Sequence, residues 1–247
     1  MPKKPNAQMK TDLKNKEATR QFRGFPTELF LFMRELAKHN DRAWFADHKK
    51  RYEEEVLAPS LAFIEAMQQP IRKISPYLTA IPKRMGGSLM RIYRDTRFSK
   101  NKAPYKTNVG IHFRHELGGD VHAPGLYLHL EPGNSFVGVG MWMPPAEPLA
   151  MIRQMIDEEP RYWKRARDDK KFITRFSLDK ESLKTAPRGY ETSHPMIEDL
   201  RRKSFAALAP ISEKELVSPL CLATVTAAYR DAKPLMKFLC NALNQPF

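Results

Sequence analysis

The stretch from Gly125 to Met143, GLYLHLEPGNSFVGVGMWM, indicates the fold class, because apolar side chains recur in it at every second residue. A period of two is typical of a β-strand that buries one face. The sequence Pro132-Gly133-Asn134 interrupts this alternation with residues that favour tight turns. The stretch therefore predicts two strands, over 125–131 and 135–143, joined as an antiparallel hairpin.

The alternation also extends upstream of this hairpin. It predicts two further strands, from Ser88 to Asp95 and from Thr107 to His115. An antiparallel meander is the simplest way to connect four such strands. A further strand is expected from Ser204 to Ala209.

Helical spacing dominates both ends of the chain. A helix is predicted from about Pro26 to Lys38, and Asp41 is a good N-cap for a second helix that Pro59 should interrupt. The segment from Pro219 onward is again helical in pattern. The expected class is α+β, with an antiparallel sheet of four or more strands packed against N-terminal and C-terminal helices.

The chain of 247 residues divides into a short tail and one domain. Residues 1–21 are rich in Lys, Asn and Gln, and we expect them to form a disordered basic tail. Residues 22–247 are long enough to bury a core and are expected to form a single α+β domain. No apolar run reaches the roughly 18 residues of a membrane span, and no secretory signal is evident, so we expect a cytoplasmic protein without a membrane partner. Cys221 and Cys240 are predicted to be buried free thiols.

The net charge of +14 limits the classes of partner. Residues 1–20 contribute +4 of this charge, so the remainder of the chain is itself basic at +10. A basic surface favours phosphate-bearing partners, including nucleotides, nucleic acid and phosphorylated metabolites. The alternative is a basic surface that has no specific partner.

The segment from Arg91 to Tyr105, RIYRDTRFSKNKAPY, is the strongest functional signal. Cations recur in it at every third residue around a single acid, and aromatic rings lie between them. Guanidinium and ammonium groups spaced in this way are suited to phosphate or carboxylate. The predicted ligand-binding residues are Arg91, Tyr93, Arg94, Asp95, Arg97, Lys102, Tyr105, Lys106 and Tyr127, although Tyr105 is equally well explained as a packed anchor.

This segment resembles the signature of an uncharacterised bacterial and fungal family, domain-of-unknown-function family 2461. The signature reads R-x-x-R-D-x-R-F and then N/D-K-x-P-Y, and every fixed position is met, by Arg91, Arg94, Asp95, Arg97, Phe98, Asn101, Lys102, Pro104 and Tyr105. The resemblance extends from about Phe22 to the C-terminus. It implies no particular activity, cofactor or catalytic residue, so function has to be argued from the residues.

The alternation also sorts the four predicted strands by face. One face is apolar and is the expected core: Met90, Ile92, Val109, Ile111, Phe113, Leu126, Leu128, Leu130, Val137, Val139 and Met141. The other face gathers Arg, Tyr, His and Asp with three glycines that would leave room near the backbone: Gly110, Gly138 and Gly140. We expect this polar face, with the adjoining Arg97–Lys106 loop, to be the functional site. The alternative is a helix that covers the face and uses the glycines for close packing.

The candidates for catalysis are His112, His129 and Glu131, which share the polar face and offer an acid/base pair. Asp95 is expected to orient an arginine, because a carboxylate among so many cations is a weak base. No metal site and no cofactor are predicted, since no recognised ligand spacing is present and the local positive charge repels divalent cations.

Three hypotheses of function follow. The first, which we favour, is a binding or catalytic site for a small phosphate-bearing or other anionic ligand. The second is a protein that binds or processes nucleic acid. The third is a non-enzymatic interaction domain in which the Arg91–Lys106 segment is an internal ion-pair network. The sequence assigns neither a reaction nor an oligomeric state.

Overall fold

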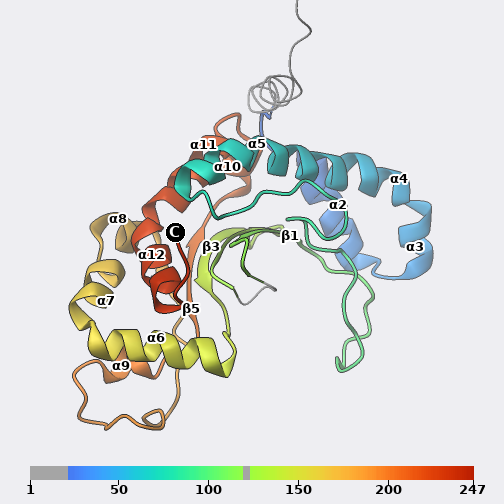
Figure 1. The fold of residues 1–247 in the computed structure, drawn as a ribbon. Helices are drawn as coiled ribbons and strands as arrows, with labels where there is room; N and C mark the ends of the chain where they lie inside the picture. Colours follow the sequence, from blue (N-terminus) through green and yellow to red (C-terminus); the bar gives the residue numbers. More distant parts are fainter. Residues whose placement is uncertain (1–21, 119–122) are drawn as a thin grey trace, which may run out of the picture.

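The computed structural model describes residues 22–118 and 123–247, and its centre is a five-stranded antiparallel sheet (Figure 1). The strand order is β1-β2-β3-β5-β4. The strands are β1 (Val109–Arg114), β2 (Gly125–Leu130), β3 (Phe136–Met141), β4 (Ser177–Leu178) and β5 (Phe205–Pro210). The predicted meander is confirmed for β1 to β3, and the predicted strand near the C-terminus is β5. The predicted disordered tail, 1–21, lies outside the described residues.

Helices precede and follow the sheet and lie on both sides of it (Figure 1), which confirms the predicted α+β class. Those before the sheet are α2 (Thr27–Lys38), α3 (Arg42–Asp47), α4 (Lys49–Arg51), the π-helix η1 (Tyr52–Leu57) and α5 (Ala58–Ile74). Those after β3 are α6 (Ala146–Glu158), α7 (Pro160–Arg167), α8 (Lys170–Arg175), α9 (Ile197–Leu200), α10 (Glu213–Val217), α11 (Cys221–Asp231) and α12 (Lys233–Ala242). Across the described ranges, none of these helices combines the length and apolarity needed to cross a bilayer.

The N-terminal helices follow the sequence pattern except at Pro59. The carboxylate of Asp41 accepts a hydrogen bond of 2.9 Å from the backbone N–H of Trp44 and so caps α3 as predicted. The predicted interruption at Pro59 is wrong, because helical backbone continues from η1 into α5 and Pro59 occupies the first turn of α5. A proline near the start of a helix removes little, because its fixed φ suits the helical backbone there.

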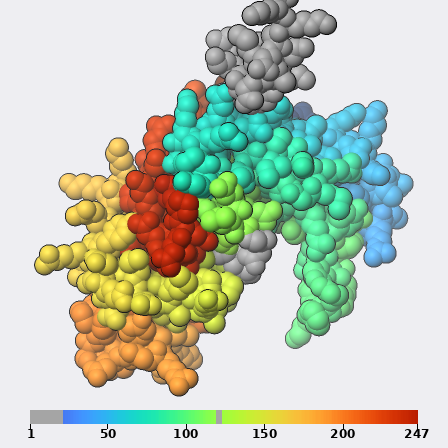
Figure 2. Space-filling view, viewed as in Figure 1, coloured from blue at the N-terminus to red at the C-terminus, as the bar shows by residue number. Residues whose placement is uncertain are grey.

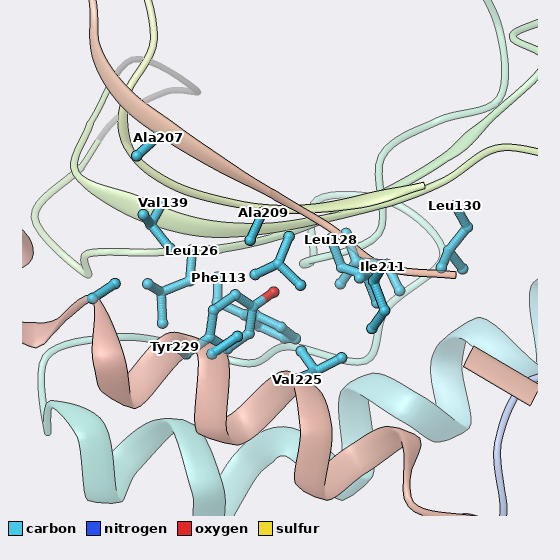
Figure 3. Packing of buried hydrophobic residues seen from close by; sticks show 14 of the residues in the cluster. Phe113, Leu126, Leu128, Leu130, Val139, Ala207, Ala209, Ile211, Val225 and Tyr229 are labelled. Atoms are coloured by element: carbon cyan, nitrogen blue, oxygen red, sulfur yellow. The ribbon is translucent and has the colours of Figure 1, made fainter. Parts of the chain in front are cut away.

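The apolar face of the sheet forms the core with α11 and α5. Figure 3 shows Val225 and Tyr229 of α11 directed at this face of the sheet. All nine predicted core residues of β1, β2 and β3 are buried: Val109, Ile111, Phe113, Leu126, Leu128, Leu130, Val137, Val139 and Met141. Cys221 and Cys240 are buried free thiols, as predicted.

The predicted strand from Ser88 to Asp95 is wrong as a continuous strand. It makes only isolated bridges, of which the first pairs Leu89 with Ile111 of β1. Paired residues share a face of a sheet, so Leu89 lies on the core face and Met90 on the other. The predicted alternation is therefore displaced by one residue here, and Met90 lies beside Gly110 on the face opposite the core.

After Met90 the chain leaves β1 and pairs with residues 104–106 instead. Lys106 N–H donates to the carbonyl of Ile92 at 2.8 Å, and Arg94 N–H donates to the carbonyl of Pro104 at 2.9 Å. Residues 91–105 thus form a hairpin-like projection that we call the arm. Figure 2 shows the arm, in green, standing out from the rest of the surface.

Candidate functional site

The base of the arm is fixed to the N-terminal helices through Tyr105. Its ring stacks on Phe45 of α3 with centroids 4.1 Å apart and an interplanar angle of 20°, and the residue is only 5% exposed. The side chain of Asn40 also accepts a bond from Tyr105 N–H and donates one to Tyr105 O, each at 3.0 Å. Tyr105 is therefore the anchor of the arm, which was the alternative to a ligand contact.

Asp95 and Arg97 form an exposed ion pair within the arm. Arg97 Nη2 lies 2.7 Å from Asp95 Oδ2, and Arg97 Nε lies 3.0 Å from Asp95 Oδ1. Hydrogen bonds from Arg97, with a further contribution from the charge of Arg91, lower the pKa of Asp95 to about 2. Asp95 is therefore ionised at neutral pH and orients Arg97, and it is a poor general base.

The remaining polar residues of the arm bond mainly to the arm itself. Lys102 Nζ donates to the carbonyl of Thr96 at 2.9 Å, and Arg94 Nη2 donates to Ser99 Oγ at 3.4 Å. These bonds shape the end of the arm, and two of its three aromatic rings lie at the surface. Tyr93 is 55% exposed and Phe98 is 95% exposed.

Arg91, which is exposed, and Lys106 lie within electrostatic range of each other at the base of the arm. Burial lowers the pKa of the half-buried Lys106, and the positive charge of Arg91 lowers it further. Within residues 22–118 and 123–247, neither side chain has a hydrogen-bond or ion-pair partner. A partly desolvated ammonium near a second positive charge is disfavoured, and a bound anion would stabilise both charges.

A hydrogen-bonded network lies on the polar face of the sheet, along β2. His129 Nε2 lies 3.2 Å from Glu131 Oε2, and His129 Nδ1 lies 3.1 Å from the hydroxyl of Tyr127. Asn108 Nδ2 is 3.4 Å from the same Nδ1, and the ring of Phe136 stacks on His129 at 4.5 Å. We call Tyr127, His129 and Glu131 the face network.

Both ring nitrogens of His129 have partners in this arrangement. The partners are all satisfied when Nε2 carries the proton and donates it to Glu131 while Nδ1 accepts from Tyr127 and Asn108. Burial lowers the pKa of His129 although Glu131 opposes the effect, and burial raises the pKa of Tyr127 to about 12. His129 is thus neutral at pH 7, and proton transfer to a substrate would first require Tyr127 to move away. The catalytic role of His112, His129 and Glu131 stays a prediction.

The glycines of the polar face accommodate side chains of the sheet itself. A Cβ atom on Gly110 would lie 2.6 Å from the hydroxyl of Tyr127, and one on Gly125 would collide with the ring of His112. Gly140 has φ of +98° and closely approaches the carbonyl of Phe205 on β5. The expectation that the glycines leave room for a ligand is therefore wrong at Gly110 and Gly140, where protein atoms fill the space.

The face network and the base of the arm adjoin each other. Met90, which immediately precedes Arg91, lies beside Gly110 at the position where the hydroxyl of Tyr127 also lies. On the other side of the arm, Thr107 follows Lys106 and its Oγ1 is 3.4 Å from Glu131 Oε1. The structure thus brings Arg91 and Lys106 close to the face network, while Asp95, Arg97 and Lys102 lie farther out along the arm.

Asn40 is the residue of this region that the sequence gives no reason to select. It lies 65 positions before Tyr105, and no local pattern links the two. Among the described residues, no three His, Cys, Asp or Glu side chains come together in a group able to hold a metal ion.

Comparison with known proteins identifies a family for the chain. The family model described as "Conserved hypothetical protein (DUF2461)" matches residues 28–238, which include the arm, the sheet and the helices around them. No curated protein and no solved structure matches the chain. Because the family model spans most of its length, the chain belongs to the conserved hypothetical protein family DUF2461.

Proposed function

We propose that the protein binds a small phosphate-bearing ligand at the base of the arm, between Arg91 and Lys106. The observations that carry this proposal are that Arg91 and Lys106 lie within electrostatic range of each other and that neither side chain has a hydrogen-bond or ion-pair partner among the described residues. Arg91 offers a planar fork to two phosphate oxygens, and Lys106 supplies a point charge. A bound phosphate would neutralise both groups and remove the mutual repulsion that now lowers the pKa of Lys106.

The surroundings of the two cations support a site of limited size. Asn40 binds the backbone of Tyr105 and so fixes the side of the arm that carries Lys106. On the other side, Met90, which precedes Arg91, packs against Gly110 of β1. The backbone that carries the two cations is therefore fixed by the fold. A fixed backbone reduces the entropy that the site loses on binding.

The arrangement of Asp95 gives less support to an internal ion-pair network. Asp95 pairs with Arg97 two residues away, and both side chains are exposed on the arm. This pair does not join the arm to the sheet. We therefore favour a ligand site over an interaction domain held together by the arm's charges.

A thermal-shift screen of the purified full-length protein tests the proposal, with inorganic pyrophosphate, ATP and sugar phosphates as probes. A ligand present at 100 times its Kd stabilises the folded state by about 2.7 kcal/mol, which for a domain of this size raises Tm by about 5–11 °C. The shift should disappear in Arg91→Ala and in Lys106→Met. Lys73→Ala, which removes an exposed cation of α5, is the matched control and should keep the shift. Equal shifts in all three variants would refute the proposal.

A further inference from the structure

The tip of the arm carries the most exposed aromatic ring of the described residues, at Phe98. A phenylalanine that is 95% exposed contributes nothing to the core, so its ring is free to contact a partner. The ring does have one neighbour, because the guanidinium of Arg97 lies over it at 5.8 Å from the centroid. The tip therefore presents a flat apolar surface next to a cation.

A second exposed ring lies closer to the body of the protein. Tyr93 is 55% exposed and leans on the buried Tyr105, with centroids 5.4 Å apart. Arg84 and Tyr93 both lie close to the hydroxyl of Tyr52, whose pKa each of them influences. Arg84 Nη2 lies 3.0 Å from Glu53 Oε1, so the basic loop that contains Lys83 and Arg84 is held beside the helix that carries Tyr52.

The charge of the arm selects the kind of partner that would cover these rings. Residues 91–105 hold five cations and one carboxylate, a net charge of +4, and Arg97 neutralises that single carboxylate. The exposed surface thus combines separated aromatic faces with an excess of positive charge. Single-stranded nucleic acid has the complementary chemistry, since it offers unpaired bases that stack on aromatic rings and a phosphate on every residue.

The other partners with negative charge fit these features less well. A duplex keeps its bases stacked inside and has no free base for Phe98. A membrane surface requires a continuous apolar face, whereas Phe98 is followed by the polar run Ser99-Lys100-Asn101-Lys102. We propose that the arm is a docking element for single-stranded nucleic acid, with bases stacked on Phe98 and Tyr93 and a phosphate held by Lys100.

This proposal is independent of the phosphate site at Arg91 and Lys106, because Phe98 and Lys100, which the test changes, lie at the tip of the arm. The test is fluorescence anisotropy with a labelled 20-nucleotide oligothymidylate and a duplex of the same length, at 50 and 200 mM NaCl. Phe98→Ala should weaken binding of the single strand about 5- to 150-fold, the range for loss of one stacked base, and Phe98→Trp should restore it. Ile173→Ala, which removes an exposed apolar side chain of α8, is the matched control and should bind normally.

The salt dependence separates stacking from charge. Lys100→Ala should reduce the slope of log affinity against log salt by about 0.7, the value for one phosphate contact on a single strand, whereas Phe98→Ala should leave the slope unchanged. Phe98→Ala should also keep the thermal shift by pyrophosphate, which distinguishes a failure here from a failure of the phosphate site. The proposal would be overturned if the oligonucleotide did not bind at 50 mM NaCl, or if wild type and Phe98→Ala bound it with equal affinity. It would also be overturned if the protein preferred the duplex or phosphatidylserine vesicles.

Discussion

Replacement of Asn40 by alanine tests how the arm is held. The side chain makes two hydrogen bonds of 3.0 Å to the backbone of Tyr105, and that residue is 5% exposed. A hydrogen bond of this kind contributes about 1 kcal/mol net, so the variant should lose about 2 kcal/mol of unfolding free energy. For a domain of this size that loss lowers Tm by about 4–8 °C.

The assay is urea denaturation followed by circular dichroism, together with a thermal melt. Asn101→Ala is the matched control, because Asn101 accepts one bond from Ala103 N–H at an exposed position on the same arm. It should change the unfolding free energy by less than about 0.5 kcal/mol. If Asn40→Ala were no less stable than Asn101→Ala, the inference that Asn40 anchors the arm would be refuted.

Three further predictions concern the sheet and the core. Gly140→Ala should lose more than about 2 kcal/mol of unfolding free energy in urea denaturation, because φ is +98° and the new Cβ would meet Phe205 O. Gly138→Ala, whose Cβ would have its nearest contacts at 3.4 Å, should lose much less. Equal losses in the two variants would contradict this prediction. Burial lowers the pKa of His129, so its contribution to stability is present above a pH of about 6.5 and is lost as the pH falls through the folded-state pKa. His129→Gln should therefore flatten the fall in Tm between pH 7 and 5, and an unchanged fall would show that His129 is not responsible. Burial raises the pKa of Cys221 and Cys240 to about 12. Ellman's reagent should therefore label both thiols rapidly only in denaturant. Fast labelling of the native protein would contradict their burial.

The strands of the sheet were largely predictable, because apolar residues stand at every second position and these are the side chains that one face of a sheet buries. Ile111, Phe113 and Leu128 alternate with polar residues, and a register shifted by one residue would expose all of them. The segment from Ser88 to Asp95 has the same alternation, but its backbone bonds change partner after Met90. A period of two shows that a segment is extended and does not show which strand it pairs with, so the sequence did not reveal the arm.

The candidate site was predicted in part for a similar reason. Clustering of cations was evident from spacing alone, whereas the pairing of Asp95 with Arg97 and the proximity of Arg91 to Lys106 depend on the turn of the arm. The glycine at 110 was read as space for a ligand, but the space is filled by Tyr127 from the neighbouring strand. Contacts between residues far apart in the sequence, like that of Asn40 with Tyr105, leave no local pattern in the sequence.

If Arg91 and Lys106 share a bound phosphate, the titration of Lys106 has to change when the phosphate binds. The pKa of Lys106 can be followed by NMR of protein labelled with ¹³C-lysine, with Lys106→Arg to assign the signal. Burial and Arg91 lower this pKa in the free protein, so saturating pyrophosphate should raise the pKa of Lys106. In Arg91→Ala the pKa of Lys106 should already be higher without ligand, and pyrophosphate should not change it further. The same pKa with and without pyrophosphate in the wild type would contradict the claim.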